Sequence, residues 1–305
     1  MNSVRPIERV RLQNILHLTD FSEPSSTALR YAIAIAREYV AAVHALHVLI
    51  PVGAAWARTG LSSLASEAQE ETAQIEMQRI ASALAGVAYD TNIVTDVAVW
   101  PTVQRALEDC KADLIVLGTH GRTGKEKMLL GSVAEEIFRL SPVPVLTTGP
   151  QSRQQVHNAA RFRRILFATD FSSPSMAALP HALSLAQETG ARVILLHVIR
   201  RPGEMSFEPE LSVAAALHQL HELLPPGVEA WCRPEAVVEY GDPAARILHV
   251  AAERHADLIV LGVRDAAGRL SAATHQEDTT AHSVVIQSKC PVLTVRGSTP
   301  ASRPV

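Results

Sequence analysis

Residues 15–22 read ILHLTDFS, and the same stretch returns 150 positions later as ILFATDFS at residues 165–172. A second stretch, ADLIVLG at residues 112–118, returns unchanged at residues 256–262. Ordered matches of this kind indicate an internal duplication and not chance similarity. The period is far longer than that of a solenoid repeat, so each copy is expected to fold as a whole domain.

The length of the chain agrees with two domains. Its 305 residues are enough for two cores of ordinary size. The polar stretch at residues 151–160 lies between the copies and is typical of a linker. We therefore expect domains at residues 1–150 and 161–299.

Composition narrows the class of protein. Hydrophobic residues make up 47% of the chain and aromatic residues only 4%, so the cores must consist mainly of aliphatic side chains. A net charge of −3 gives no electrostatic reason to expect nucleic acid or an anionic membrane as a partner. Every apolar run is shorter than the roughly 20 residues of a membrane span. Three scattered cysteines favour a reducing, cytoplasmic location.

Short apolar strands alternate with amphipathic helices in each copy. Ser22 can cap the first helix, with Pro24 in its first turn. In the first copy, strands are predicted at residues 15–19, 43–49, 91–97, 114–117 and 143–147, and later helices at residues 61–85, 101–110 and 132–140. We expect the second copy to repeat this order. The alternation predicts an α/β fold with two tandem doubly wound domains, each a mainly five-stranded parallel sheet flanked by helices.

The segment after the fourth predicted strand carries candidate chemistry. It reads GTHGRTG at residues 118–124 and GSV at residues 131–133. We expect Gly118 to let the chain turn sharply at the carboxyl end of the strand, where α/β sheets place ligands. Because Gly121 and Gly131 lack Cβ, backbone N–H groups can approach phosphate oxygens there. The helix that begins at residues 131–132 favours an anion at its N-terminus.

A glycine-rich loop alone is a weak signal, because a long surface loop also uses glycine for its turns. The pattern is neither the P-loop motif nor the dinucleotide-binding glycine triplet. Its spacing, however, resembles the ATP-binding signature of the universal stress protein family: Gly118, two residues, Gly121, nine residues, then Gly131-Ser132. With the TDFS stretch, the resemblance covers residues 15–147 and 164–295. It implies a Rossmann-like fold of the adenine nucleotide alpha hydrolase type.

The resemblance also implies an ATP site in the first domain, with Mg²⁺ or Mn²⁺ accompanying the nucleotide. The implied binding residues are Leu18, Thr19, Asp20, Val48, Leu117, Gly118, His120, Gly121, Arg122, Gly131, Ser132 and Val133. Asp20 would lie near the ribose or the phosphate-bound cation, and Val48 would line the adenine. Asp20 can instead be a carboxylate that caps the first helix, and His120 a solvated loop residue. We assign no catalytic residue and no protein metal site.

The second copy departs from the signature. Asp265 stands where the first copy has Gly121, and DT at residues 278–279 replaces GS at residues 131–132. Carboxylates at these places would repel phosphates and compete for the same amides. We therefore expect ATP only in the first domain. The first copy has its own departure, VAV at residues 97–99 in place of GDP at residues 241–243, and we expect altered packing near the rim of its pocket.

The resulting hypothesis is a cytoplasmic ATP-binding regulator of stress response or signalling that acts through ligand-dependent conformation or association. One alternative is a slow ATPase or nucleotide-transferring enzyme, with Asp20 or His120 as its base. Another is an interaction scaffold with a vestigial pocket. Expected partners are an adenine nucleotide and an unidentified protein, with no nucleic acid and no membrane. The last strands, residues 143–147 and 292–295, can pair the two domains within the chain as a pseudo-dimer, and homo-oligomers are possible.

Overall fold

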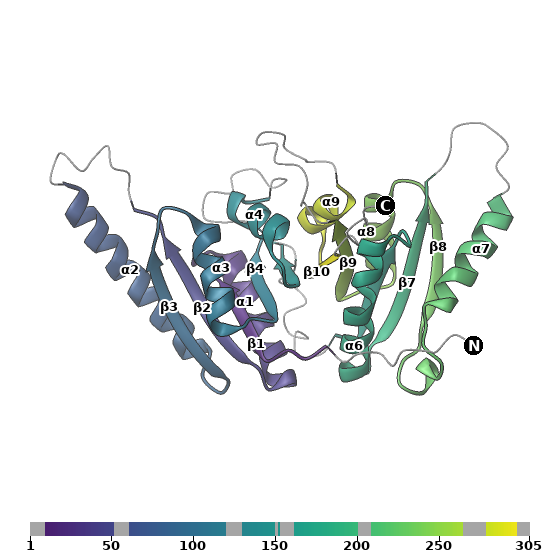
Figure 1. The fold of residues 1–305 in the computed structure, drawn as a ribbon, viewed down its shortest axis with the longest axis horizontal. Coiled ribbons are helices and arrows are strands. Elements are labelled where there is room, and N and C mark those ends of the chain that lie inside the picture. The colour runs from purple at the N-terminus through teal and green to yellow at the C-terminus, as the bar shows by residue number, and fades with distance from the viewer. Residues whose placement is uncertain are drawn as a thin grey trace, which may run out of the picture. The chain divides into compact units, whose positions relative to one another are not determined.

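A computed structural model describes residues 10–51, 61–119, 130–149, 152, 162–200, 209–264 and 279–297 of the chain. It separates into two compact units, one of residues 11–150 and one of residues 151–305 together with residues 1–10. In both units, helices alternate with parallel strands along the chain (Figure 1). Within the described ranges, no helix combines the length and the apolar character needed to cross a membrane.

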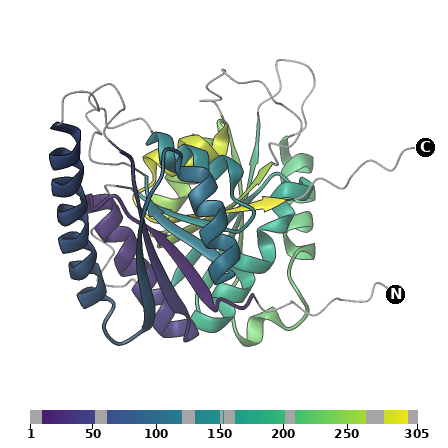
Figure 2. The same ribbon diagram turned by 60° about the vertical axis from the view of Figure 1, so that its left-hand side comes forward.

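The first unit is a doubly wound five-stranded sheet. Its elements are β1 (Asn14–Leu18), α1 (Glu23–Tyr39), β2 (Ala42–Leu49), α2 (Leu61–Ala83), β3 (Ala88–Thr95), α3 (Val99–Cys110), β4 (Leu114–Gly118), α4 (Ser132–Leu140) and β5 (Val145–Thr148). The strands lie in the order β3-β2-β1-β4-β5, and all neighbours are parallel. The winding reverses between β1 and β4, so right-handed crossovers place α1 and α2 on one face and α3 and α4 on the other. Figure 2 shows α1 and α2 together beside these strands.

Local signals explain why these elements form. Ser22 is the N-cap of α1, and its hydroxyl accepts a hydrogen bond from the Ser25 N–H, as the sequence predicted. The central strands β1 and β4 are mostly apolar and buried, as expected when helices cover both faces of a sheet. The third strand differs from its prediction at residues 91–97, because it begins at Ala88 and ends at Thr95. Asp96 ends it, since its carboxylate accepts a hydrogen bond from the Val97 N–H at 2.7 Å.

The second unit repeats the order of the first, as predicted. Its elements are β6 (Arg164–Thr169), α5 (Ser173–Ala177), α6 (Leu179–Thr189), β7 (Arg192–Ile199), α7 (Pro209–Glu222), the 3₁₀ helix η3 (Val228–Ala230), β8 (Glu235–Tyr240), α8 (Pro243–Glu253), β9 (Leu258–Arg264), α9 (Thr280–Gln287) and β10 (Val292–Gly297). The strand order is β8-β7-β6-β9-β10, again parallel. One difference is a break in its first helix at Ala178. Pro180 explains the break, because it has no N–H to continue the helical hydrogen bonds.

Candidate functional site

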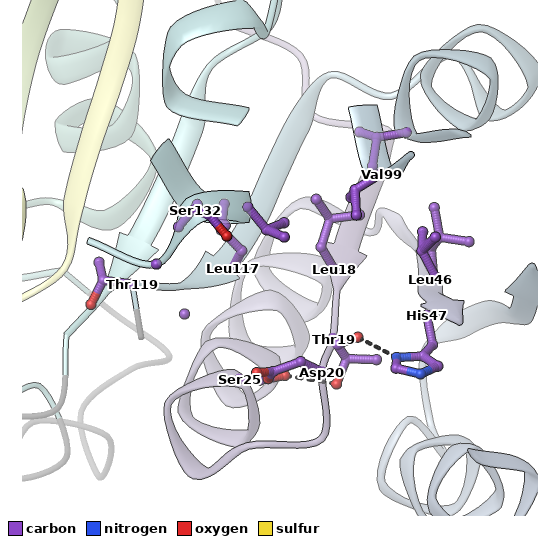
Figure 3. Close-up of a pocket in the computed structure, with 16 residues that line it drawn as sticks. Leu18, Thr19, Asp20, Ser25, Leu46, His47, Val99, Leu117, Thr119 and Ser132 are labelled. Carbon is purple, nitrogen blue, oxygen red and sulfur yellow. Dashed lines mark hydrogen bonds between the residues drawn. The ribbon is translucent and has the colours of Figure 1, made fainter. Parts of the chain in front are cut away.

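A crevice lies where the winding of the first sheet reverses. The chain leaves β1 towards α1 on one face and leaves β4 towards α4 on the other, so the carboxyl ends of these two neighbouring strands open a gap. A cavity of about 260 Å³ occupies this position (Figure 3). It is lined by Leu18, Thr19, Asp20, Ser25, Leu46, His47, Val48, Val99, Val103, Leu117, Gly118, Thr119, Gly131, Ser132, Val133 and Ala134.

The structure brings most of the sequence-predicted site residues together in this cavity. Those that line it are Leu18, Thr19, Asp20, Val48, Leu117, Gly118, Gly131, Ser132 and Val133. The other three, His120, Gly121 and Arg122, lie outside the described residues. Sequence reasoning missed Ser25, Leu46, His47, Val99, Val103, Thr119 and Ala134. Leu46 could have been found, because it lies two residues before Val48 and therefore on the same face of β2.

Hydrogen bonds hold the corner between β1 and α1. The Thr19 hydroxyl lies 2.7 Å from the Ser25 hydroxyl and accepts a hydrogen bond from the Phe21 N–H at 3.0 Å. One carboxylate oxygen of Asp20 accepts a hydrogen bond from the Ser22 N–H at 3.0 Å. This bond goes to the N-cap residue itself and is not the helix cap considered from the sequence, because Ser22 provides that cap; Asp20 also lines the cavity.

An aromatic contact completes this corner. Phe21 has a positive φ of 62°, which a bulky residue adopts only when its surroundings hold it there. Its ring lies 4.2 Å from that of His47, measured between centroids. Nδ1 of His47 donates a hydrogen bond to the Thr19 carbonyl at 2.7 Å (Figure 3). Thr19, which follows β1 and borders the cavity, is thus held by α1 through Ser25 and by β2 through His47.

The second unit has the same corner. His197 Nδ1 donates to the Thr169 carbonyl at 2.9 Å, and the His197 and Phe171 rings lie 4.6 Å apart. Phe171 also has a positive φ, of 59°. Because this geometry is the same in both copies while the sequences after their fourth strands differ, the TDFS stretch builds the fold in each copy.

Close packing explains Gly118 better than a turn does. Gly118 is the last residue of β4 and pairs with Thr148 in the parallel sheet, so the expected sharp turn at this glycine was wrong. A Cβ on Gly118 would lie 2.7 Å from the carbonyl carbon of Pro24 and 2.8 Å from the backbone nitrogen of Ser25. Glycine is therefore needed because the first turn of α1 lies directly against the strand end. At the matching Gly262, a Cβ would lie 2.1 Å from the Pro174 oxygen.

The register of β2 directs a backbone donor and acceptor into the crevice. The Leu46 carbonyl accepts a hydrogen bond from the Thr19 N–H on the β1 side, whereas the Leu49 carbonyl accepts one from the Asp96 N–H on the β3 side. Backbone groups alternate in direction along a strand, so those of Val48 point to the β1 side. Since β1 ends at Leu18, the N–H and C=O of Val48 face the cavity.

The helices that follow the two loops begin differently. The N-cap of α4 is Gly131, which has no side chain to accept a hydrogen bond from the first amides of the helix. The N-cap of α9 is Thr279, whose hydroxyl accepts a hydrogen bond from the His282 N–H at 3.2 Å. Among the described residues, no side chain caps the start of α4, which suits an anion, whereas Thr279 already uses one amide of α9. Asp265 and Asp278, the expected obstacles in the second copy, lie outside the described residues.

The rim formed by α3, near residues 97–99 where altered packing was expected, is apolar. The N-cap of α3 is Ala98, which makes no side-chain cap, and Val99 and Val103 line the cavity. In the second unit, Asp242 caps α8 by accepting a hydrogen bond from the Ala245 N–H at 2.8 Å. Val99 and Val103, with Leu18, Leu46 and Val48, make this end of the cavity aliphatic.

Asp96 anchors the uncapped start of α3. Its Oδ2 accepts hydrogen bonds from the Thr102 hydroxyl and from the Arg105 guanidinium, both at 2.6 Å. These contacts, the Thr102 hydroxyl first among them, lower the pKa of Asp96 to about 2. The carboxylate is therefore ionised at neutral pH, and its oxygen is already bonded to α3.

A buried histidine lies next to the site, on the opposite face of the sheet from Leu18. The His17 side chain is fully buried, and its Nδ1 donates a hydrogen bond to the Val116 carbonyl at 3.1 Å. Burial lowers the pKa of His17 to about 4, although the Val116 hydrogen bond and the charge of Asp20 raise it. Its counterpart in the second unit is Phe167. Nothing in the sequence pattern distinguished this histidine from an apolar strand residue.

Comparisons with known proteins agree with the duplicated fold. The sequence profile described as the universal stress protein family matches residues 11–148 and again residues 161–296. A universal stress protein of Methanocaldococcus jannaschii is 36% identical over 137 residues, covering 42% of this chain and 76% of that protein. One of Mycolicibacterium smegmatis is 27% identical over 260 residues, covering 81% of this chain and 86% of that protein.

A solved structure extends this similarity to both halves together. The crystal structure of a universal stress protein from Archaeoglobus fulgidus matches with a TM-score of 0.68 at 26% identity, covering 93% of this chain and 96% of that one. The family profile covers most of the chain in two successive matches. The chain therefore belongs to the universal stress protein family, as a tandem member with one family domain in each half.

Proposed function

We propose that the first domain binds ATP in the crevice between β1 and β4, and that the chain acts as a cytoplasmic regulator whose conformation or association depends on this ligand. The observation that carries the proposal is the position of the Gly131 cap. The N-terminus of α4 faces a cavity whose other end is aliphatic. A polar end for phosphates and an apolar end for a base match the two halves of a nucleotide.

The first residues of α4 would bind the phosphates. Its first amides carry the positive end of the helix dipole, and the cap residue offers them no competing oxygen. Ser132, an exposed residue at the first position of α4, lines the cavity and can add a hydroxyl donor. Thr119 lines the same end, from the position immediately after β4. We place the phosphates of ATP here.

The backbone of Val48 would bind the adenine base. Its N–H and C=O face the cavity together, which suits a base edge that offers an acceptor beside an N–H donor, as adenine does. Guanine carries a carbonyl where adenine carries its amino group, so it would set an acceptor against the Val48 carbonyl. We expect ATP to bind at least about tenfold more tightly than GTP, since one unmatched buried polar pair costs this much or more.

Asp20 fits a cation that arrives with the nucleotide. Among the described residues, no group of three or more histidines, cysteines or carboxylates is arranged to hold a metal ion. A single carboxylate that lines the cavity suits Mg²⁺ or Mn²⁺ already coordinated by phosphates. We therefore place the cation beside Asp20 and assign the protein no metal site of its own.

We propose that the second domain does not bind ATP. Thr279 occupies an amide at the start of α9, and the sequence adds Asp278 directly before Thr279 and Asp265 at the position that matches Gly121. Negative charge at a helix N-terminus satisfies the dipole that a phosphate would otherwise use. The second domain would then serve association, either with the first domain as an intrachain pseudo-dimer or with a protein partner.

Isothermal titration of the full chain with ATP and MgCl₂ tests the proposal. We expect one site per chain, and at least a tenfold loss of affinity for Gly131→Asp, because aspartate caps α4 and repels phosphate. The matched control is Ser173→Asp, which adds the same charge at the exposed start of α5 in the second unit. Two equivalent tight sites, or undiminished binding by Gly131→Asp, would contradict the proposal.

A further inference from the structure

The outer edge of β3 is a long, exposed strand edge. β3 is the last strand in the order of the first unit, and it pairs with β2 without interruption over all eight of its residues. Residues 88–92 are all exposed, and Tyr89 is 46% exposed. Regular edges of this length expose unpaired backbone groups to pairing with another chain, and natural sheets usually protect them.

The register identifies which backbone groups face outwards. The Asp96 N–H donates to the Leu49 carbonyl, so the groups of even-numbered residues in β3 point inwards to β2. Those of odd-numbered residues therefore point away from the sheet. The outward residues are Tyr89, Thr91, Ile93 and Thr95. Among the described parts of the chain, no strand lies on this side of β3.

The corresponding edge of the second unit is protected. Pro234 comes directly before β8, and β8 contains two glutamates. Glu235 lies 3.0 Å from the Arg254 guanidinium, and Glu239 lies 3.7 Å from that of Arg246. Proline and charged side chains are the usual means of keeping an edge from pairing. Two copies of β8 placed side by side would also bring four glutamates together.

β3 has fewer of these protections. It contains no proline and no lysine, and its one charged residue is Asp90. The Asp90 carboxylate lies 2.5 Å from Nδ1 of His44 on the neighbouring β2, so its charge is directed along the sheet. This leaves an uninterrupted edge whose side chains are mostly β-branched or aromatic, the types that favour cross-strand pairing.

We propose that β3 pairs in antiparallel orientation with β3 of a second copy of this chain, around a two-fold axis at Thr91. In this register Tyr89 faces Ile93 of the second copy, an aromatic and β-branched pair of the kind that stabilises sheets. Asp90 faces Asn92 of the second copy, so no like charges oppose each other. The outward groups of Tyr89, Thr91 and Ile93 then form three hydrogen-bonded pairs, each exchanging two hydrogen bonds.

The self-complementary pattern is the reason for choosing a second copy over an unrelated strand. Antiparallel pairing of identical strands is symmetric, so each contact occurs twice and the interface closes as a dimer. The single carboxylate of one strand meets the carboxamide of the other on both sides of the axis. The Thr91 side chains meet at the axis, where two hydroxyls can hydrogen bond.

Sedimentation velocity on the full chain tests the pairing. We expect a species of twice 32.9 kDa that dissociates on dilution. Thr91→Pro removes the outward N–H at the axis, a change that an edge strand tolerates, and should weaken the dimer by roughly tenfold or more. The matched control, Thr91→Val, keeps the N–H and a β-branched shape, so its dimer should persist. Far-UV circular dichroism and thermal unfolding check that both variants fold.

Cross-linking tests the register. Hydrogen-bonded residues opposite each other in antiparallel strands have Cα atoms about 5.5 Å apart, within the range that a disulfide spans. Thr91→Cys should therefore oxidise to a covalent dimer, whereas the native chain with Cys110, Cys232 and Cys290 should not. A monomer at all concentrations, or a dimer that Thr91→Pro leaves unchanged, would overturn the proposal. So would a Thr91→Cys variant that folds but forms no cross-link.

Discussion

Replacing His17 by phenylalanine, the residue at the matching position 167, should make the first domain less sensitive to acid. His17 titrates with a pKa of about 4 in the folded chain, against 6.5 for an ordinary histidine. Unfolding therefore takes up a proton between these pH values, and the free energy of unfolding falls as the pH drops below 6.5. This destabilisation is absent well above pH 6.5 and reaches its full size below the folded pKa of about 4.

The size of the effect follows from these two pKa values. Linkage predicts that protonation of His17 in the unfolded chain lowers the free energy of unfolding of the first domain by about 2 kcal/mol between pH 7.5 and pH 5. Below pH 4 the loss is roughly 3 kcal/mol. The His17→Phe variant avoids this loss. At neutral pH it also loses the hydrogen bond to the Val116 carbonyl, which is worth about 1 kcal/mol. The comparison must therefore rest on the change with pH and not on stability at a single pH.

Urea unfolding at pH 7.5 and pH 5 provides the measurement. The change in the free energy of unfolding between the two pH values is measured for both proteins. Subtracting the change for His17→Phe from that for the native chain cancels the contribution of the carboxylates, which titrate in both proteins. Phe167→His is the matched reciprocal variant, and it should introduce acid sensitivity into the second domain. If the native chain and His17→Phe lose stability equally between the two pH values, burial does not lower the pKa of His17 as argued.

Two further substitutions test the packing. Gly118→Ala places a Cβ 2.7 Å from the Pro24 carbonyl carbon, so the first domain should lose about 1–3 kcal/mol in denaturant unfolding, and ATP affinity should fall with it. Unchanged stability would mean that α1 can move away from β4 at little cost. Val40→Gly should instead stabilise the first domain by about 1 kcal/mol, because Val40 is 92% exposed with a φ of 54°, where the second domain has Gly190. A lower midpoint for this variant would show that Val40 makes a contact that outweighs the strain.

The order of strands and helices was predictable because it depends on local signals. Hydrophobic runs, the Ser22 cap and the duplication are all visible within short windows of sequence. The third strand was placed about three residues late, because Asp96 ends it by accepting a hydrogen bond from the Val97 N–H, and contacts with Thr102 and Arg105 that form only in the fold hold this carboxylate. Such contacts join residues that no strand or helix periodicity connects.

The site was predictable only where the resemblance supplied residues. Nine predicted positions line the cavity, but whether they bind nucleotide stays a prediction. Val99 and Val103 were missed, since a helix that crosses the crevice is placed by tertiary packing. His47 was missed, because its contact with Phe21 depends on a positive φ that the sequence does not reveal. His17 was missed because its burial follows from the sheet and α1 together.

The packing of Gly118 and Gly262 has a practical consequence for surveys of duplicated chains. Both glycines are required where a helix start touches a strand end, whether or not the adjoining loop can hold a phosphate. A glycine at this position therefore reports a steric constraint of the scaffold. Genome surveys that score this glycine as evidence of nucleotide binding would count domains that bind no nucleotide as nucleotide-binding domains. Residues 131 and 279, which set whether a helix start is open or capped, are the more informative markers to compare.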